Sequence, residues 1–314
     1  MPTVSFFEGL PPTAELSILI AECKAADGLS PFVHGLRVEE ADVVFHARSG
    51  HRLVGLALAA FSGKEAGSLG VGVCPEVRGR GIGKALFHRI CKSCEDALDG
   101  TSLTAWTSWP QQKIKASTMY AREALSYRFG FSLGRRLLRL GIDLPALAPV
   151  FQSGYVLDRF RPSLAEAEEV VRVNNAAFSW HPDRSAWTVE QLQEEIVADW
   201  VDLAGFFVVR HGEKLGGFCW TKMHEAESPE EKPVGEIFVV CADPVWRGKG
   251  LGRALTLSGL AYIAERSARG MLYVDESNLP ARSMYAEIGF SLEQVDSCYE
   301  RPKQKQIASS LLAK

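Results

Sequence analysis

The sequence has no excess of basic residues and no long hydrophobic run. It carries 35 Lys and Arg against 38 Asp and Glu, and the resulting net charge of −3 offers little attraction for nucleic acid or an anionic membrane. The longest apolar stretch, Leu53–Phe61, is interrupted only by Gly55 and is far shorter than the roughly 20 residues that span a bilayer. We therefore expect neither a nucleic-acid partner nor a membrane partner.

We also expect neither an export signal nor a disulfide framework. The 7 cysteines are an odd number, which favours free thiols in a reducing compartment. Cys91 and Cys94 form a CxxC pair, but they fall inside a predicted helix, and no second CxxC completes a zinc site. Three glutamates break up the apolar region that a signal peptide would need: Glu8, Glu15 and Glu22. We expect a cytoplasmic protein that holds no metal.

What the sequence does contain is an internal repeat within a globular composition. The 314 residues, 46% of them hydrophobic, suffice for two domains of roughly 100–200 residues each. The segment Val71–Gly83, VGVCPEVRGRGIG, recurs as Val240–Gly252, VCADPVWRGKGLG. Each copy passes from a strand-like run through a proline and three spaced glycines into a helical pattern. Two copies of one structural unit are the simplest explanation.

The repeat predicts an α/β fold in two tandem domains, each with a mixed sheet (α+β). Pro145 and Pro149 interrupt regular structure between the halves. We therefore expect domains at 1–145 and 154–301, followed by a loosely held tail at 302–314. Nothing in the sequence indicates an oligomer, so a monomer is the default expectation.

The glycine-rich segments have the chemistry of a pyrophosphate site. A turn that leads from a strand into a helix directs unpaired backbone N–H groups, and the positive end of the helix dipole, at one point. The spacing is GxGxG rather than the GxGxxG of a dinucleotide fold, and no Gly-Lys-Ser/Thr of an ATP loop follows. A tight turn without a ligand would explain one copy, but two copies with basic residues at matching positions favour a binding loop.

This Arg-Gly-x-Gly-x-Gly pattern resembles the acetyl-CoA loop of the GCN5-related N-acetyltransferases (GNAT). The resemblance implies two tandem GNAT-type acyl-CoA N-acyltransferase domains with acetyl-CoA as co-substrate. In that family the loop amides hold the pyrophosphate, and the preceding strand separates from its neighbour so that its backbone binds the pantetheine arm. The second half also continues the family pattern with Asn278-x-x-Ala-x-x-x-Tyr285 and then Gly289-Phe290.

Carried over residue by residue, the resemblance implies acetyl-CoA contacts in both halves. In the second half they are the strand and loop residues Val240, Cys241, Ala242, Arg247, Gly248, Lys249, Gly250, Leu251, Gly252 and Arg253, and the helix residues Asn278, Leu279, Pro280, Ala281, Arg282 and Ser283. In the first half they are Val71, Gly72, Val73, Gly79, Arg80, Gly81, Ile82, Gly83 and Lys84.

Two residues of the second half are candidates for proton transfer. An alkyl ammonium must lose a proton before its nitrogen can be acetylated, and Glu236 matches the catalytic-base position of the family. Tyr285 is the candidate acid for the departing thiolate, and a backbone amide of Val240–Ala242 can stabilise the oxyanion. A solvated edge carboxylate and a tyrosine packed in the core are the alternatives.

A closer resemblance covers roughly Tyr155–Asp296. It is to tandem members of the family that acetylate the cysteinyl amine of cysteinyl-glucosaminyl-inositol. It implies substrate contacts at Asp183, Lys222, Glu236 and Tyr273. The family also has an acidic contact in the first half, where this sequence has His34, whose ring can still hydrogen-bond a hydroxyl. Surface charges are the alternative for each of these residues.

The first half retains the loop but not the other residues. At the positions that correspond by counting to Glu236, Asn278 and Tyr285, it has Gly67, Met119 and Ser126. We therefore expect one active site, in the second half, and a catalytically silent first half. Two other functions stay open: acetylation of another small-molecule amine, and acyl-CoA binding without turnover.

Overall fold

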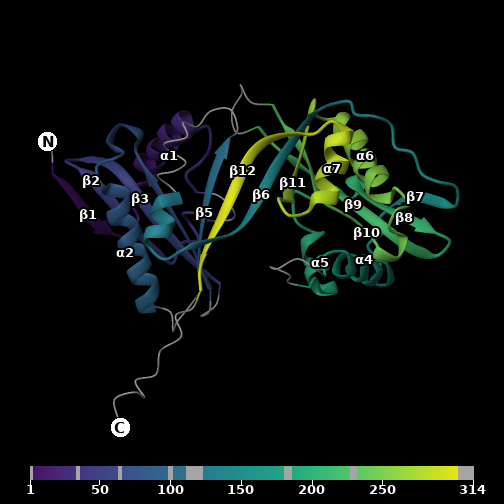
Figure 1. Cartoon of the computed structure of the whole chain (residues 1–314), viewed down its shortest axis with the longest axis horizontal. Coiled ribbons are helices and arrows are strands. Elements are labelled where there is room, and N and C mark those ends of the chain that lie inside the picture. Colours follow the sequence, from purple (N-terminus) through teal and green to yellow (C-terminus); the bar gives the residue numbers. More distant parts are fainter. Residues whose placement is uncertain are drawn as a thin grey trace, which may run out of the picture. The chain divides into compact units, whose positions relative to one another are not determined.

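The computed structural model describes residues 3–32, 36–62, 66–97, 102–110, 123–179, 186–226 and 232–302 (Figure 1). The chain divides into two compact units, which we call unit 1, residues 1–138 and 293–314, and unit 2, residues 139–292. No helix in the described ranges is long and apolar enough to cross a membrane.

Unit 1 is a sheet with one helix before and one helix after the first glycine-rich loop. Its strand order is β1-β2-β3-β4-β5-β12-β6. The strands are β1 (Val4–Glu8), β2 (Val43–Ser49), β3 (Arg52–Ser62), β4 (Ala66–Val73), β5 (Ser102–Pro110), β12 (Ser291–Arg301) and β6 (Ser132–Asp143). The helices α1 (Thr13–Asp27) and α2 (Ile82–Ala97) lie wholly within the described residues, and residues 123–128 are also helical. From β1 to β4, neighbouring strands pair antiparallel, and β4 and β5 pair in parallel.

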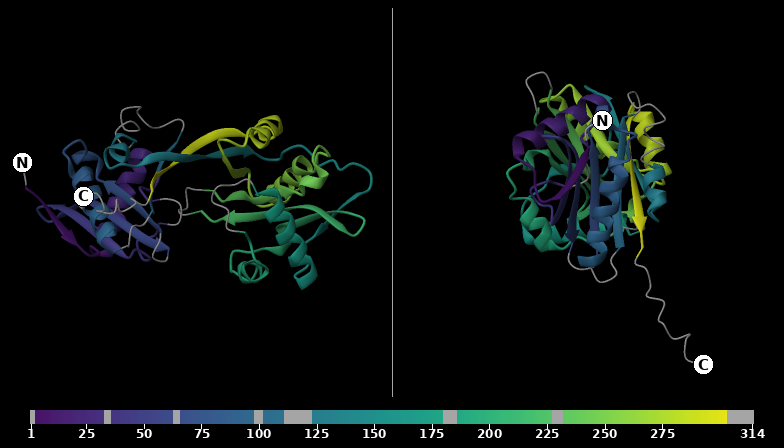
Figure 2. Two further views of the ribbon diagram at one scale, coloured as in Figure 1. Left: turned by 60° about the horizontal axis from the view of Figure 1, so that its bottom comes forward. Right: turned by 90° about the vertical axis from the view of Figure 1, so that its left-hand side faces the viewer.

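Unit 2 repeats this plan. Its strand order is β6-β11-β10-β9-β8-β7, with β11 (Arg269–Asp275), β10 (Val234–Ala242), β9 (Lys214–His224), β8 (Phe206–His211) and β7 (Tyr155–Arg159). Its helices are α4 (Leu164–Ala177), α5 (Val189–Glu195), α6 (Leu251–Ala264) and α7 (Leu279–Ile288). The left view of Figure 2 shows α6 on one face of this sheet and α4 and α5 on the other. The expected mixed α/β sheet is confirmed.

The last strand of the chain belongs to unit 1, although the repeat had grouped residues 154–301 together. Residues Gln294–Arg301 of β12 pair antiparallel with Leu103–Pro110 of β5. Because this ladder is formed with the first half, the contact-based division of the chain differs from the expected bounds at this strand.

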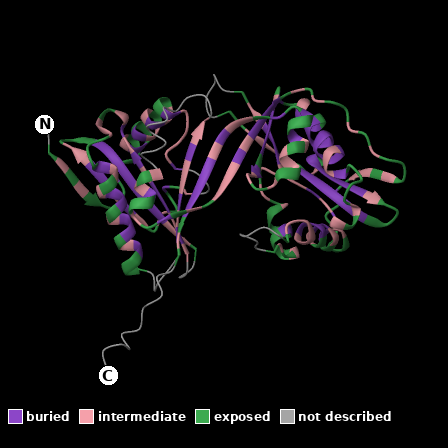
Figure 3. Ribbon diagram, in the orientation of Figure 1, coloured by how far each residue is buried: buried purple, intermediate pink, exposed green. Residues whose placement is uncertain are grey.

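Each unit has its own hydrophobic core. In unit 1, β3 is buried from Leu53 to Ala59, and α2 covers one of its faces, where the Leu86 side chain packs over Gly55. In unit 2, α4 and α5 pack on β8 and β9 around Phe206, Phe218 and Trp220. Figure 3 shows the same contrast in both units, with buried central strands and helices whose outer faces are exposed.

Local signals in the sequence determine where the helices of unit 2 begin. The capping box at the start of α5 is complete: the Thr188 hydroxyl accepts from the Gln191 amide, and the Gln191 side chain accepts from the Thr188 amide. α5 ends at Glu195, since the chain then turns and brings Trp200 into a stacked contact with Trp220.

Candidate functional site

Strands β10 and β11 separate at the centre of unit 2. They pair in parallel only at Gly235–Gly270 and Glu236–Met271. From Val239 to Ala242, β10 is paired with β9 on its other edge. The edge toward β11 is therefore available to a ligand over the predicted positions Val240, Cys241 and Ala242. A backbone edge of this kind can hydrogen-bond the amides of an extended chain such as pantetheine.

A β-bulge lies in β10 beside this opening. The register with β9 shifts between Ile237 and Val239, which leaves Phe238 as the extra residue. Phe238 and Val239 both pack on the α4–α5 side, and Glu236 lies opposite Lys222 on the same face. The bulge thus permits β10 to present both a carboxylate and two apolar side chains to one face.

The second glycine-rich loop has the geometry of an anion site. Gly248 and Gly250 have φ values of 77° and 73°, and Gly250 is the N-cap of α6. A Cβ added at either glycine would meet no atom within 4 Å, so the loop backbone is open on that side. The next three predicted residues, Leu251, Gly252 and Arg253, provide the first-turn amides of α6, which have no partner within the helix.

The charge around this loop also suits a pyrophosphate. Within the described chain, no ion pair involves Arg247 or Lys249, and Arg253 has only a 3.9 Å contact with the exposed Glu287. The cations therefore remain available for phosphate oxygens. The residues present fit the CoA moiety of acetyl-CoA.

The expected Asn278–Ser283 segment forms the start of α7. The Asn278 side chain caps this helix by accepting a hydrogen bond from the Ala281 amide at 3.3 Å. Arg282 donates to the Glu276 carbonyl at 2.7 Å, which fixes the turn before the helix. Leu279 is 65% exposed at the first helical position. Asn278 therefore has a structural role as the helix cap, in addition to any contact with a ligand.

Glu236 lies at the opening and is buried, with 8% of its surface exposed. Its Oε2 is 2.6 Å from Nε2 of His224, at the end of β9, whose side chain is 39% exposed. The sequence reasoning missed His224. Its place at the end of a predicted strand next to that of Glu236 was the available signal, but no pattern pointed to it.

Tyr285 on α7 is buried, and its ring packs against Phe290 with a centroid distance of 5.6 Å. Burial, followed by the nearby Cys219 and Cys241 thiols, raises the pKa of Tyr285. The phenol therefore keeps its proton at neutral pH and can serve as a proton donor there.

The expected substrate contacts are only partly described. The Lys222 ammonium lies 4.2 Å from the centroid of the Trp200 ring and 5.4 Å from that of Phe238. Tyr273 on β11 is 39% exposed. His34 and Asp183 lie outside the described residues.

A buried ion pair holds the start of the second loop. Asp243, which is 4% exposed, accepts from Arg172 of α4 at 2.6 Å and from the Val245 amide at 2.9 Å. Burial opposes ionisation, but these hydrogen bonds outweigh it and lower the pKa of Asp243. The pair therefore ties α4 to the turn that leads into Arg247.

We expect Arg172→Met to lower the free energy of unfolding by about 1–3 kcal/mol at pH 7, because it leaves a buried carboxylate without its main partner. The folded-state pKa of Asp243 is depressed, so this contribution is present above the unfolded pKa of about 3.9 and is lost as pH falls through the folded value. Urea unfolding at pH 7 and at a series of pH values from 4 down to about 2 measures both effects. Glu169→Gln, which removes only the exposed partner of Arg172, is the control and should change stability by less than about 0.5 kcal/mol.

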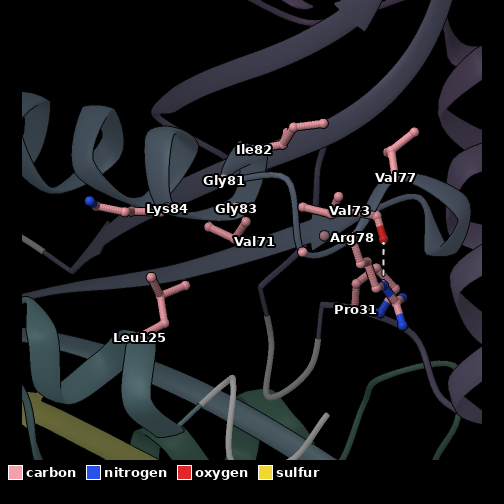
Figure 4. A pocket seen from close by; sticks show the side chains of 12 residues that line it. Pro31, Val71, Val73, Val77, Arg78, Gly81, Ile82, Gly83, Lys84 and Leu125 are labelled. Atoms are coloured by element: carbon pink, nitrogen blue, oxygen red, sulfur yellow. Dashed lines mark hydrogen bonds between the residues drawn. The ribbon is translucent and has the colours of Figure 1, made fainter. Parts of the chain in front are cut away.

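Unit 1 contains a cavity of about 300 Å³ at the first loop. Eight of the nine predicted contacts line it: Val71, Gly72, Val73, Gly79, Gly81, Ile82, Gly83 and Lys84. Arg80 instead donates to the Glu76 carbonyl. Figure 4 shows Arg78 at the cavity wall, with its hydrogen bond to the Val73 carbonyl. Arg78 also donates twice to the buried Asp27, at 2.7 and 2.8 Å, so its guanidinium is held by the protein.

The two units match strand for strand, which identifies the counterparts of the catalytic candidates. β3 and β9 each have 11 residues, and the Cys74 and Asp243 amides bind the Val54 and Gly216 carbonyls in the same way. By strand length, Ala60 of β3 corresponds to Lys222 of β9. β4 pairs with β3 without a bulge, and its residue opposite Ala60 is Ser68. Ser68 is therefore the counterpart of Glu236, which lies opposite Lys222.

The counterpart of Tyr285 is Ser126. The amides of Phe131 and Phe290 bind the carbonyls of Ser126 and Tyr285, at 3.1 and 3.0 Å. The neighbouring Tyr127 is 53% exposed and packs on Tyr299. Met119 lies outside the described residues. Unit 1 therefore has a loop with a cavity but neither the carboxylate nor the phenol at these positions.

All 7 cysteines are free and buried. Burial raises the pKa of both Cys91 and Cys94 to about 12, which keeps these thiols protonated and unreactive. The described ranges contain no group of three or more His, Cys, Asp or Glu side chains that could hold a metal ion.

Sequence and structure comparisons both match this chain to acetyltransferases. The sequence model of the acetyltransferase (GNAT) family matches residues 16–116 and 170–290. A mycothiol acetyltransferase of Rhodococcus opacus (strain B4) is 34% identical over 304 residues, which cover 92% of this chain and 94% of that protein.

Two solved structures have the same fold. A GCN5-related N-acetyltransferase from Sphaerobacter thermophilus superposes with a TM-score of 0.73 at 20% identity and covers 96% of both chains. A tandem GNAT protein from the clavulanic acid biosynthesis pathway superposes with a TM-score of 0.67 at 16% identity, over 96% of this chain and 99% of that chain.

Proposed function

The chain belongs to the acetyltransferase (GNAT) family, and on that premise we propose that it transfers the acetyl group of acetyl-CoA to the cysteinyl amine of cysteinyl-glucosaminyl-inositol, which gives mycothiol. The observation that carries this proposal is the 34% identity to a mycothiol acetyltransferase over nearly the whole length of both proteins. The open edge of β10, the loop before α6 and the buried Glu236 support it.

In this proposal unit 2 performs the chemistry. The loop amides and Arg247, Lys249 and Arg253 hold the pyrophosphate, and the edge of β10 holds the pantetheine arm. Glu236 takes the proton from the substrate ammonium, and Tyr285 donates one to the departing thiolate. Acetyl-CoA supplies the activated thioester, and a backbone amide of Val240–Ala242 stabilises negative charge on its oxygen. Lys222 and Tyr273, with Asp183 and His34, bind the acceptor.

Unit 1 binds acetyl-CoA without turning it over. Its cavity at the first loop supports binding, and Ser68 and Ser126 in place of a base and an acid support the lack of turnover. We also expect the enzyme to act in the cytoplasm as a monomer on this small-molecule amine.

The test is release of CoA from acetyl-CoA with cysteinyl-glucosaminyl-inositol as acceptor, followed by mass spectrometry of the product. CoA is resolved by chromatography, because the acceptor is itself a thiol and would react with a thiol dye. One acetyl group on the nitrogen is the expected product. No turnover with bound acetyl-CoA would contradict the assignment and favour another amine or an acyl-CoA sensor.

We expect Tyr285→Phe to slow acetyl transfer by about 10–10³-fold while acetyl-CoA binding is retained. The substitution keeps the ring that packs on Phe290, so this contact should be unchanged. Steady-state kinetics and calorimetric titration with acetyl-CoA measure the two effects. Loss of acetyl-CoA binding would instead indicate that Tyr285 acts through packing.

A further inference from the structure

The contact between Glu236 and His224 links the end of β9 to the candidate base. Its length is 2.6 Å, which is short for a nitrogen–oxygen hydrogen bond and typical of one with a charged partner. A carboxylate can only accept hydrogen bonds, so the ionised Glu236 requires the proton to be on Nε2 of His224. The second carboxylate oxygen, Oε1, makes no hydrogen bond to a described residue.

From this contact we infer that His224 is a positioning residue for the acetyl transfer: its Nε2–H binds Oε2 of Glu236 and thereby directs Oε1 at the amine. This inference rests on the proposed role of Glu236 as the base. A carboxylate on a strand can rotate about its side-chain torsions, and a fixed acceptor oxygen reduces the cost of reaching the reactive geometry.

The surroundings of the pair favour this role. Lys222 is opposite Glu236 on the same face of the sheet, but its ammonium lies over the Trp200 and Phe238 rings. From α4 and α5 this face receives apolar side chains, among them Val173 and Leu192. By strand alternation, β11 adds three titratable groups to the face: Arg269, Tyr273 and Asp275. Arg269 pairs with Asp143, and Asp275 accepts hydrogen bonds from Ser277. His224 is therefore the side chain that hydrogen-bonds Glu236 within the described residues.

The other unit provides an internal comparison. β3 and β9 have equal lengths, so His224 corresponds to Ser62, and Glu236 corresponds to Ser68 by pairing. Both members of the pair are thus replaced together in the unit that also has Ser126 in place of Tyr285. This is expected if the imidazole serves the carboxylate, since a general stabiliser of the strand end would be useful in both units.

The test is a double-mutant cycle with His224→Leu, His224→Gln and Glu236→Gln, measured as acetylation of cysteinyl-glucosaminyl-inositol. We expect His224→Leu to lower kcat by about 10–100-fold with little change in KM for acetyl-CoA. His224→Gln, whose amide can donate to Oε2, should recover most of that loss. In the Glu236→Gln background, His224→Leu should have no further effect, because it acts through the missing carboxylate.

Three results would overturn the inference: unchanged kcat in His224→Leu, an equal loss in His224→Gln, or losses that multiply in the double variant. An equal loss would indicate that the imidazole itself accepts the amine proton. The ¹⁵N spectrum of the His224 ring tests the pair without any acceptor. A proton on Nε2 is expected, and a ring that is protonated on Nδ1 alone would contradict the inference even if the proposed substrate proved wrong.

Discussion

We expect the Glu236→Gln variant to lose about 10²–10⁴-fold in kcat for acetyl transfer at pH 7. Glutamine keeps the shape of the side chain and can still accept the hydrogen bond from His224, but it cannot take a proton from the ammonium. The loss should therefore appear in kcat, with the KM for acetyl-CoA unchanged within about threefold.

The pH profile gives this prediction a control. An α-amino group has a pKa of about 7.7–8.0, so a growing share of the acceptor is already neutral as pH rises above 8. Acceptor molecules whose amine is already neutral need no base, so the activity of the variant should approach that of the parent as pH increases. A Glu236→Gln variant as fast as the parent at pH 7 would show that the base lies elsewhere.

The second large effect is expected at Gly250. Its φ of 73° lies in the left-handed region, which costs a β-branched residue at least about 1–2 kcal/mol. The valine methyl groups of Gly250→Val would also occupy the open side of the loop, where we propose that the phosphate binds. We expect kcat/KM for acetyl-CoA to fall by about 100-fold, which corresponds to about 2.7 kcal/mol.

Gly81→Val in unit 1 is the matched control. Gly81 has a φ of 83° and the same open surroundings, and it precedes α2 as Gly250 precedes α6. We expect it to leave kcat unchanged within about threefold, and to reduce acetyl-CoA binding in equilibrium dialysis from two molecules to one. If Gly81→Val abolished turnover while Gly250→Val did not, the active site would be in unit 1 rather than in unit 2.

The sequence was informative where function depends on backbone conformation. A left-handed residue before a helix requires glycine, so Gly248 and Gly250 could be recognised in the letters alone, and so could the helix that follows. The same holds for the family: the matches to GNAT proteins confirm the resemblance drawn from the loop and from the Asn278–Tyr285 segment. The mixed sheet followed from the order of strands and helices.

Counting residues back from the loop was less reliable for finding corresponding strand residues in the two halves. Eleven residues before Arg78 is Gly67, whereas the pairing of β4 with β3 makes Ser68 the counterpart of Glu236. The difference is the bulge at Phe238, which adds one residue to β10 and none to β4. A bulge depends on the fit between two strands and on side chains packed from other elements, so a local pattern does not reveal it.

By itself the sequence therefore determined the repeat and the family, and it predicted the binding loop and the two candidates for proton transfer, because these depend on residue types at fixed spacing. Only the tertiary structure decided three other features: that β12 pairs with β5, that Arg78 is held by Asp27, and that His224 meets Glu236. Each of these joins residues that are distant in the sequence or on different strands. Their contacts arise from strand order, register and burial, which are properties of the packed chain rather than of any local segment.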